Sequence, residues 1–338
     1  MYDAIVIGAR CAGASTAMLL ARKGYRVLLL DRAKFPSDLP HGHFIHQQGP
    51  ARLKRWGLID AIEATNCPRV ESVVSDFGDF PLQSSGIAVD GLGLGYGPRR
   101  KVLDSLLIDA AVVSGAEFRE SCAVESVLLD GDRVVGIRGR DANGNAFEER
   151  ARFVIGADGR NSRLARMMKA PAYESVPTLA CYVFSYWSGI ALNRLCVYAR
   201  PQRAVFAFPT NDGLFAVFAG VPIAEVEAVK ADMEGHFNAT LAAIPALDEP
   251  LRAGRREERF YAAADLPNFY RKPYGAGWAL VGDAGCHKDP YLALGLHDAF
   301  RDADLLSDAL DSAFSGRDSF DHALASYESR RNEASIGA

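Results

Sequence analysis

The chain has few cysteines, no long apolar run and no excess of charge of one sign, and each of these absences excludes a class of protein. Its 338 residues include six cysteines, and no two of them form a Cys-x-x-Cys pair, so neither a disulfide framework nor a zinc site is indicated. Cys11 and Cys286 have no partner cysteine nearby, and we expect both to be small packed residues rather than redox thiols. No stretch approaches the roughly 18 consecutive apolar residues of a membrane-spanning helix. The 38 Lys and Arg against 42 Asp and Glu give a net charge of −4, which is too balanced for a nucleic-acid-binding protein.

What is present is the composition of an ordinary globular protein. With 49% hydrophobic and 24% charged residues, the chain can bury a substantial core. Its length predicts two domains, at about 150 residues per domain. Asp3 and Arg10 interrupt the apolar residues at the amino terminus, so a secretory signal is not expected. We therefore expect a soluble, reduced, cytoplasmic protein without a transmembrane segment.

The first 31 residues predict a βαβ unit. An apolar run over 2–7 ends at a glycine, a helix-forming stretch follows over 14–23, and a second apolar run over 25–30 ends at Asp31. Such a crossover implies a parallel sheet.

The turn inside this unit resembles a dinucleotide fingerprint. Gly8 permits a tight turn and Gly13 a close approach of helix and strand, whereas Arg10 stands where a middle glycine normally leaves room for a pyrophosphate. Asp31 is placed where a carboxylate receives ribose hydroxyls. The unit therefore predicts a dinucleotide site; a plain βαβ unit with Asp31 capping a loop is the alternative.

A second glycine-containing turn lies near the other end of the chain. Gly282 and Asp283 end a short apolar strand, and a helix that starts near Leu296 follows them. A carboxylate at the carboxyl end of a strand faces the crevice where open α/β sheets bind ligands. The amino terminus of the next helix suits an anionic ring or a phosphate. The two turns together predict one long ligand that reaches both, and a simple strand-to-helix turn is the alternative.

The remaining patterns predict a second, β-rich unit. The region 173–222 is rich in Tyr, Phe, Val and Cys and has turn signals, which predicts several antiparallel strands. We expect the amphipathic stretch over 224–244 to form one helix that covers them. Elsewhere the spacing predicts helices over 49–56, 101–114, 296–310 and 320–331, strands over 151–155 and 278–281, and a hairpin over 122–129 and 133–140.

Six aromatic side chains alternate at strand spacing in the β-rich region: Tyr182, Phe184, Tyr186, Phe206, Phe208 and Phe218. Residues two apart on a strand face the same side of a sheet. We expect part of this set to form core between the sheet and the helix, and the remainder to form an apolar pocket wall.

Three patterns together resemble the FAD-dependent aromatic hydroxylases, or group A flavoprotein monooxygenases, within the wider glutathione-reductase-like superfamily. They are the turn at 8–13 with Asp31 and Arg32, the stretch Ile155-Gly156-Ala157-Asp158-Gly159-Arg160-Asn161-Ser162-Arg163, and Gly282-Asp283-Ala284 followed by Pro290 and Gly295. A weaker fourth pattern is the arginine-started helix over 100–107. The order of these patterns covers nearly the whole chain and is specific, although no single pattern is. The chain ends soon after Arg331, earlier than the resemblance leads us to expect.

The resemblance implies an FAD site, with NAD(P)H as reductant. The implied cofactor-binding residues are Gly8, Cys11, Ala12 and Gly13 at the pyrophosphate, Asp31 and Arg32 at the adenosine, Val124 at the adenine through its backbone, Arg100 and Asp283 at the pyrophosphate and ribityl chain, Asp158 where FAD and NAD(P)H meet, Gln47 close to FAD, and Pro290, Gly295, Leu296 and His297 beside the isoalloxazine. Arg10 must then point away from the phosphates or pair with them. The flavin carries the chemistry, so no side-chain nucleophile is required and no catalytic residue is named.

The fold that the resemblance implies is α/β: a Rossmann-like FAD-binding domain with an inserted β-rich substrate-binding domain. The FAD-binding domain would comprise residues 1–70, 98–172 and 268–338, and the substrate-binding domain residues 71–97 and 173–267. The implied enzyme is a flavin-dependent oxidoreductase. It would be a monooxygenase that uses NAD(P)H and O₂ to hydroxylate or epoxidise an apolar, aromatic or polyketide-like small molecule.

Three alternatives share this fold. A prenyl-chain reductase of the geranylgeranyl type is the nearest, because the run over 206–209 faintly resembles the aromatic-proline signature of that group. A flavin halogenase is disfavoured because the Trp-x-Trp motif is absent. A non-enzymatic lipid carrier is disfavoured because Asp31, Asp158 and Asp283 are all retained.

The histidines near residue 45 do not predict a metal site. His41, His43 and His46 lie within six residues, but no carboxylate or cysteine accompanies them at ligand spacing. We expect the polar run His46-Gln47-Gln48 to pass close to FAD instead. His297, near a helix start, is equally well explained as a helix-end residue and as a flavin contact.

Overall fold

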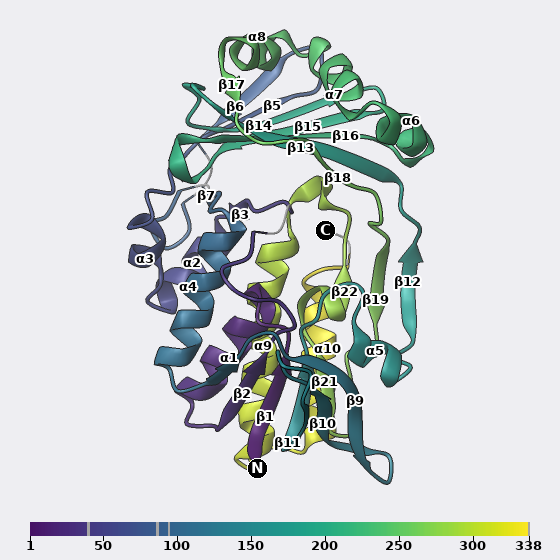
Figure 1. The fold of residues 1–338 in the computed structure, drawn as a ribbon. Helices are drawn as coiled ribbons and strands as arrows, with labels where there is room; N and C mark the ends of the chain where they lie inside the picture. Colours follow the sequence, from purple (N-terminus) through teal and green to yellow (C-terminus); the bar gives the residue numbers. More distant parts are fainter. Residues whose placement is uncertain (39–40, 86–87, 94, 337–338) are drawn as a thin grey trace.

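A parallel β-sheet forms the centre of the lower half of the molecule (Figure 1). Within residues 1–38, 41–85, 88–93 and 95–336, which the computed structural model describes, five strands run parallel in this sheet. They are β1 (Tyr2–Ile7), β2 (Val27–Leu30), β8 (Glu117–Arg119), β11 (Ala146–Gly156) and β21 (Trp278–Leu280). The order is β20-β21-β11-β1-β2-β8, and the short edge strand β20 (Tyr274–Gly275) pairs antiparallel with β21. The α/β class and the parallel sheet implied by the βαβ pattern are therefore confirmed.

The strands of this sheet are nearly continuous apolar runs because both faces are covered. Ala4 and Val6 of β1 pack into a core with α1 (Cys11–Arg22), α4 (Arg100–Val113) and α9 (Gly295–Phe314). Ile5, between them, faces the opposite core, which is closed by the hairpin of β9 (Ala123–Asp130) and β10 (Arg133–Arg140). The hairpin is the one expected from the sequence.

A second sheet lies above the first, and its strands come from two separate segments of the chain (Figure 1). Its order is β17-β13-β16-β15-β14-β5-β6, and β18 also pairs with β13. The expected antiparallel pairing over 173–222 is confirmed for β13 to β16, whereas β14 and β5 pair in parallel. The strands are β5 (Val73–Asp76), β6 (Pro81–Ser84), β13 (Ala180–Ser188), β14 (Leu195–Arg200), β15 (Arg203–Pro209), β16 (Phe215–Pro222), β17 (Arg255–Arg256) and β18 (Tyr261–Ala263).

The single helix expected over 224–244 is wrong. The segment forms α6 (Val226–Ala231) and α7 (Met233–Ala242), and α8 (Pro245–Ala253) follows. The chain breaks at Asp232, whose backbone is non-helical (φ −147°, ψ 78°) and whose carboxylate accepts a hydrogen bond from the Gly235 N–H at 2.8 Å. An aspartate satisfies free N–H groups at a helix start better than it supports a helix interior. Asp232 therefore begins a new helix instead of continuing the first one.

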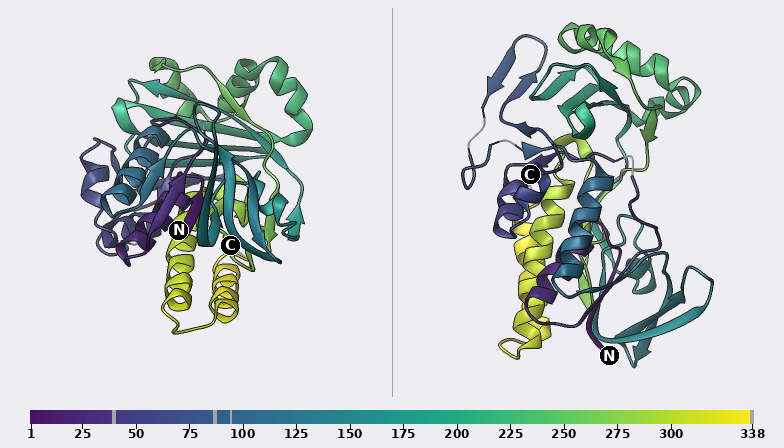
Figure 2. Two further views of the ribbon diagram at one scale, coloured as in Figure 1. Left: turned by 60° about the horizontal axis from the view of Figure 1, so that its bottom comes forward. Right: turned by 60° about the vertical axis from the view of Figure 1, so that its left-hand side comes forward.

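Short strands and the remaining helices connect and cover the two sheets. Beside the lower sheet, α9 and α10 pack against each other (Figure 2). The other predicted helices are confirmed, with α9 extending further than expected. The other elements are β3 (Ile45–His46), β4 (Arg69–Val70), β7 (Gly95–Tyr96), β12 (Ala172–Val176), β19 (Asn268–Arg271), β22 (Cys286–His287), α2 (Gln48–Arg55), α3 (Ile59–Glu63), α5 (Arg163–Met167), α10 (Phe320–Glu333), and the 3₁₀ turns Asn211–Gly213, Ile223–Glu225, Gly282–Ala284 and Pro290–Leu292.

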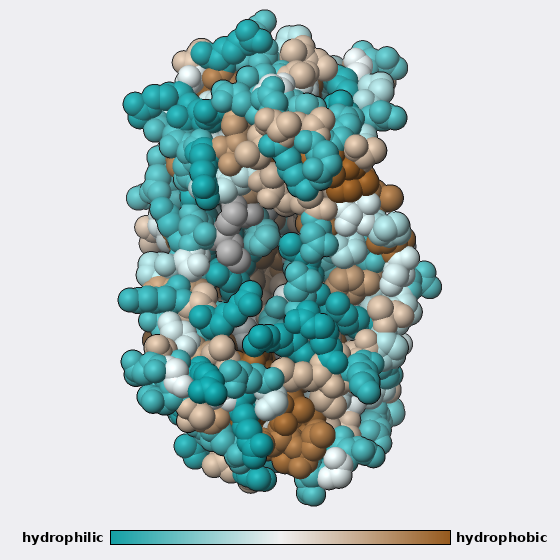
Figure 3. Space-filling model, turned by 45° about the vertical axis from the view of Figure 1, so that its right-hand side comes forward, coloured by the Kyte–Doolittle hydropathy of each residue, from teal (hydrophilic) through white to brown (hydrophobic). Residues whose placement is uncertain are grey.

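The surface around β12 and β19 is mostly hydrophilic, and apolar residues appear there only in small separate groups (Figure 3). None of the described helices is long and apolar enough to cross a membrane. The boundaries of the two domains stay a prediction.

Candidate functional site

One cavity of about 820 Å³ lies between the two sheets. It is lined by the residues that follow β1, β2, β11 and β21, which is the carboxyl edge where open α/β sheets bind ligands. Most of the predicted cofactor residues line it: Gly8, Cys11, Ala12, Asp31, Arg32, Arg100, Val124, Asp158, Asp283, Pro290, Gly295 and Leu296. Gly13, Gln47 and His297 are not among its lining residues. The cofactor contact assigned to each residue stays a prediction.

The glycine turn is built by two close approaches of backbone. Gly8 has a φ of +103°, and a Cβ there would lie 2.4 Å from the Ala157 carbonyl oxygen. A Cβ on Gly13 would lie 1.8 Å from the Gly8 carbonyl oxygen. Glycine is therefore required at both positions for α1 to begin directly against β1 and the loop after β11. Gly13 serves this packing from outside the cavity.

Asp31 braces the same turn. Its Oδ2 accepts a hydrogen bond from the Ala9 N–H and its Oδ1 from the Ala33 N–H, both at 2.8 Å. The alternative of a loop-capping aspartate is therefore part of what this residue does. Each carboxylate oxygen has capacity for a further hydrogen bond, so a ribose contact is compatible with this role.

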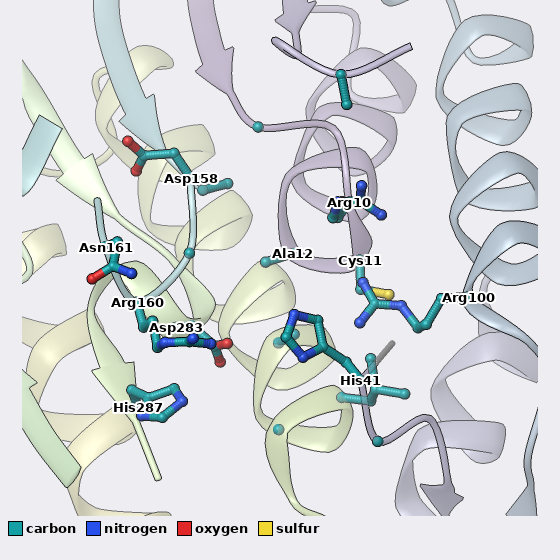
Figure 4. Close-up of a pocket in the computed structure, with 18 of the residues that line it drawn as sticks. Arg10, Cys11, Ala12, His41, Arg100, Asp158, Arg160, Asn161, Asp283 and His287 are labelled. Carbon is teal, nitrogen blue, oxygen red and sulfur yellow. The ribbon is translucent and has the colours of Figure 1, made fainter. Parts of the chain in front are cut away.

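Asp158 and Arg160 form the opposite side of the cavity (Figure 4). Asp158 Oδ2 accepts from the Arg163 N–H at 2.6 Å and so caps α5. Its Oδ1 and the Arg160 Nε are buried without a hydrogen-bond partner among the described residues. The Arg163 side chain donates to the Val124 carbonyl at 2.9 Å. Arg160 Nε has an ion-pair contact at 3.6 Å with Asp265 Oδ2. Two buried polar atoms without hydrogen bonds at a cavity wall are suited to a polar ligand.

Asp283 is the carboxylate at the floor of the cavity, close to Arg160 (Figure 4). Burial raises the pKa of Asp283, while His287, Arg100 and Arg160 act against this shift. Gly282, with a φ of +60°, lets the chain turn tightly here, and a Cβ would meet the Ala12 side chain at 2.7 Å. The glycine turns at the two ends of the sequence therefore touch in the fold, as one long ligand requires.

The amino terminus of α9 meets the cavity on its other side. Gly295 and Leu296 of its first turn line the cavity, and so does Ala293, which has a left-handed backbone (φ +51°, ψ 34°). His297 is not a lining residue of the cavity. Burial lowers the pKa of His297 to about 4, and the charge of Arg52 acts in the same direction. The first turn of a 20-residue helix brings free N–H groups and partial positive charge to the cavity.

The aromatic residues of the upper sheet form the roof of the cavity. The register pairs Phe218 with Phe184 on one side and with Phe206 on the other. The rings of Phe184 and Phe218 stack at 4.7 Å, and those of Phe208 and Phe218 at 5.7 Å. The cavity-lining members are Tyr182, Phe184, Phe206, Phe208 and Phe218, joined by Phe44.

The expectation that part of this aromatic set packs between sheet and helix is wrong. All six residues lie on the face turned away from α6–α8, and Tyr186 is buried there beside His43. The core under the helices is built by the intervening residues, among them Val183, Val205 and Val217. The period of a strand separates the two sets, but the sequence does not say which set faces the cavity.

His43 lines the cavity, and no pattern in the sequence predicts a specific role for it. Its Nδ1 lies 3.0 Å from the Gly97 carbonyl oxygen and its Nε2 3.1 Å from the Tyr186 hydroxyl. A carbonyl only accepts, so Nδ1 carries the proton and the Tyr186 hydroxyl donates to Nε2. Burial lowers the pKa of His43 to about 3, and the nearby Arg99 guanidinium acts in the same direction.

Charge in the cavity wall is predominantly positive. The lining cations are Arg10, Arg32, Arg100, Arg160, Arg163, Arg166 and Lys288, against the carboxylates Asp31, Asp158 and Asp283. Among the described residues, no group of His, Cys, Asp and Glu is arranged to hold a metal ion. The wall therefore suits an elongated ligand with an anionic centre and hydroxyl groups.

The sequence matches the FAD binding domain family over residues 1–336, and the chain belongs to this family. Among its relatives, tryptophan 2-halogenase of Chondromyces crocatus is 24% identical over 92% of this chain and 61% of the relative. Digeranylgeranylglycerophospholipid reductase 2 of Methanopyrus kandleri is 28% identical over 88% of this chain and 73% of the relative. The chain thus spans less than two thirds of the halogenase.

Solved structures have the same fold. The myxobacterial chondrochloren halogenase CndH has a TM-score of 0.89 and 25% identity, over 98% of this chain and 79% of that chain. PqsL of Pseudomonas aeruginosa, a probable FAD-dependent monooxygenase, has a TM-score of 0.83 and 21% identity, over 98% and 91%. The predicted membership in the FAD superfamily is confirmed, and these neighbours include both oxygenating and halogenating enzymes.

The donor set of the cavity fits FAD. Cationic side chains and the free N–H groups at the start of α1 suit a diphosphate. Carboxylates at Asp31 and Asp283 suit the hydroxyls of a ribose and a ribityl chain. The roof of aromatic rings and the amino terminus of α9 suit a flat ring that gains negative charge on reduction.

Proposed function

We propose that this chain is an FAD-dependent monooxygenase that uses NAD(P)H and O₂ to hydroxylate or epoxidise a compact, apolar, aromatic or polyketide-like molecule. The observation that supports this most is the roof of stacked aromatic rings over the cavity. Each pair of rings on neighbouring strands contributes about 0.5–1.5 kcal/mol of stability beyond that of buried area, and the paired rings have little freedom to move. Such a rigid roof suits a compact substrate better than a long, flexible chain.

In this proposal the lower half of the molecule holds the cofactor. Gly8, Cys11 and Ala12 lie along the diphosphate, Asp31 and Asp283 accept hydroxyl hydrogen bonds, and the first turn of α9 lies beside the flavin ring. FAD bound there would supply the redox chemistry, as an acceptor of hydride and a donor of electrons to oxygen. The residues of the chain orient the ring, place the substrate and keep water out.

The roof residues Phe184, Phe206 and Phe218 hold the substrate against the flavin side of the cavity. Phe44 and Phe208 complete this apolar chamber, their rings 5.2 Å apart. An apolar, enclosed chamber excludes water from the reacting atoms, which an oxygenase needs in order to avoid loss of activated oxygen.

The test uses purified full chain. Heat-released cofactor is compared with FAD and FMN standards by chromatography, and the enzyme is then supplied with NAD(P)H and a panel of aromatic and isoprenoid compounds under ¹⁸O₂. We expect FAD, and a product that carries one labelled oxygen atom. FMN, or no flavin after reconstitution, would contradict the cofactor assignment.

A second candidate is a prenyl-chain reductase, favoured by the reductase relative at 28% identity. A reductase would give a product with two added hydrogens and no label, formed equally well without oxygen. That outcome would replace the monooxygenase assignment while leaving the FAD assignment intact. A halogenated product that depends on added halide would favour the halogenase relatives instead.

A further inference from the structure

Arg10 stands in the glycine turn at the position where a dinucleotide fingerprint has its middle glycine. It is the residue that caps the start of α1, with an extended backbone (φ −87°, ψ −166°). Its side chain therefore starts beside the free N–H groups of the first turn of α1, where nucleotide-binding proteins hold a phosphate. It lines the cavity together with Cys11 and Ala12.

Contacts from two other segments, α4 and the loop over 35–37, fix the Arg10 guanidinium. Its Nη1 lies 2.6 Å from Asp104 Oδ2 on α4, and its Nη2 donates to Ser37 Oγ at 3.3 Å. The guanidinium also lies 5.3 Å from the centroid of the Phe35 ring. A guanidinium has five N–H donors, so these contacts orient the group and leave donors for a ligand.

Asp104 holds a second arginine at the same wall. Its side chain has no exposed surface and also lies 3.0 Å from Arg100 Nη2. It accepts a further hydrogen bond from Cys11 Sγ at 3.2 Å. One carboxylate thus serves two guanidinium groups, and Asp104 with the two arginines carries a net positive charge. Arg10, Cys11 and Arg100 lie beside one another at the cavity wall (Figure 4).

The other charged groups of this part of the cavity do not remove that excess. Asp283 interacts with both Arg100 and Arg160, and Arg160 also pairs at 3.6 Å with Asp265, whose side chain is mostly exposed to water. Three arginines therefore face the two buried carboxylates Asp104 and Asp283. Burial lowers the pKa of His41 to about 4, so His41 is neutral at pH 7. A net charge held away from bulk water is costly unless an anion pairs with it.

We propose that Arg10 is a binding residue for the diphosphate of the dinucleotide. A charge-assisted hydrogen bond from Arg10 takes the place of the close backbone approach that a glycine at this position allows. Asp104 acts as a positioning residue that presents Arg10 and Arg100 together. The inference rests on the proposed FAD site, but it concerns the phosphate chemistry alone, so it can be tested with a ligand that has no flavin.

The dinucleotide fingerprint, which has glycine at the middle position, leads to the opposite expectation for the effect of Arg10 on FAD binding. If the middle position only needs room, Arg10→Gly restores the usual glycine and leaves FAD binding unchanged or tighter. If Arg10 binds the diphosphate, both Arg10→Gly and Arg10→Met weaken binding. Arg10→Met keeps an unbranched side chain over Phe35, and Arg10→Lys keeps the charge without the fork of donors.

The experiment measures dissociation constants for FAD by flavin fluorescence on the full-length chain, and competition by ADP and by adenosine. Arg26→Met is the matched control, because Arg26 lies over the ring of Tyr2 at 4.7 Å and is not a lining residue of the cavity. We expect Arg10→Met to weaken FAD binding roughly tenfold to 100-fold. We expect Arg10→Lys to fall between it and the parent, and Arg26→Met to bind like the parent.

ADP and adenosine separate the diphosphate from the rest of the ligand. We expect the parent to prefer ADP over adenosine and Arg10→Met to lose most of this preference. Equal FAD and ADP binding by the parent and Arg10→Met, or tighter FAD binding by Arg10→Gly, overturns the inference and leaves the proposed function standing. If the parent binds no FAD, the proposed function fails, and ADP binding that depends on Arg10 still supports the diphosphate site.

A structural role for Arg10 is distinguished by urea unfolding without nucleotide. Loss of the contacts to Asp104 and Ser37 lowers the stability of each variant, but a purely structural role lowers FAD, ADP and adenosine binding together. A loss confined to ligands that carry phosphate supports the inference, and an equal loss for adenosine overturns it.

Discussion

Asp283 is a buried carboxylate in the cavity wall, and in the proposed FAD site it serves the ribityl chain. Its carboxylate lines the cavity between Arg160 and the loop before α9, and burial raises its pKa. A buried carboxylate is retained only where partners compensate for its desolvation. Hydroxyl groups of a bound ribityl chain would be such partners.

We therefore expect Asp283→Ala to weaken FAD binding by about 1–3 kcal/mol, or roughly fivefold to 150-fold, because cofactor hydroxyls lose their acceptor. Asp283→Asn keeps one acceptor oxygen and should lose less. The measurement is a fluorescence titration with FAD. Asp130→Ala, at the exposed end of β9, is the control, and equal affinity in all variants would count against the assignment.

At the scale of elements, the break between α6 and α7 shows how one side chain redirects a helix. Asp232 accepts the Gly235 N–H and begins α7, whose Phe237 stacks on Trp187 of β13 at 5.2 Å. The break lets α7 turn its apolar residues onto the outer face of the upper sheet. In a single straight helix, the apolar residues of 226–231 and 233–242 would be spread around the helix axis, and they could not all face the sheet.

We expect Asp232→Ala to lower the free energy of unfolding by about 1 kcal/mol, because the first turn of α7 loses its cap. FAD binding should be unchanged, since α7 lies on the face of the sheet opposite the cavity. Urea denaturation gives the stability. Glu227→Ala, an exposed member of a pair with Lys230 on α6, should cost a few tenths of a kcal/mol at most, and an equal loss in both variants would contradict the capping role.

At the scale of the whole molecule, the two halves are joined through buried polar contacts beside the cavity. His43, in the segment before β3, bonds the Tyr186 hydroxyl of the upper sheet. Arg99, just before α4, lies 4.0 Å from the Tyr186 ring centroid and 2.8 Å from Glu258. These contacts hold the aromatic roof above the loops that line the rest of the cavity.

The buried contact between His43 and Tyr186 predicts that the stability of the protein depends on pH. The pKa of His43 is about 3 in the folded chain and about 6.5 in the unfolded chain, so the unfolded chain binds the extra proton below pH 6.5. Stability is therefore complete above pH 6.5 and falls as the pH drops toward 3. His43 alone accounts for about 2 kcal/mol of the loss by pH 5.

Urea denaturation of the parent and His43→Gln between pH 7.5 and pH 5 measures this effect. We expect the parent to lose stability more steeply than the variant as the pH falls. His322→Gln, at the exposed start of α10, is the matched substitution. Parallel curves for the parent and His43→Gln would contradict a buried, neutral His43.

The sequence by itself determined the features that depend on neighbouring residues. The turn at Gly8, the βαβ unit, the hairpin of β9 and β10 and the helices at both ends follow from apolar periodicity and from glycines that only a tight turn requires. The ordered patterns at 8–13, 155–163 and 282–295 were sufficient for the family. Each of these features depends on the conformation of a short segment, and the residues of that segment determine its conformation.

Only the tertiary structure decided which faces and which distant residues meet. Strand alternation separated Phe184 and Phe218 from Val183 and Val217, but either set could have faced the cavity, because a period of two has no direction. The pairing of Arg10 with Asp104, 94 residues apart, has no local signal at all. Such contacts form because the order of the strands brings distant loops together. The interaction stabilises the fold only after the rest of the chain has placed the two side chains next to each other.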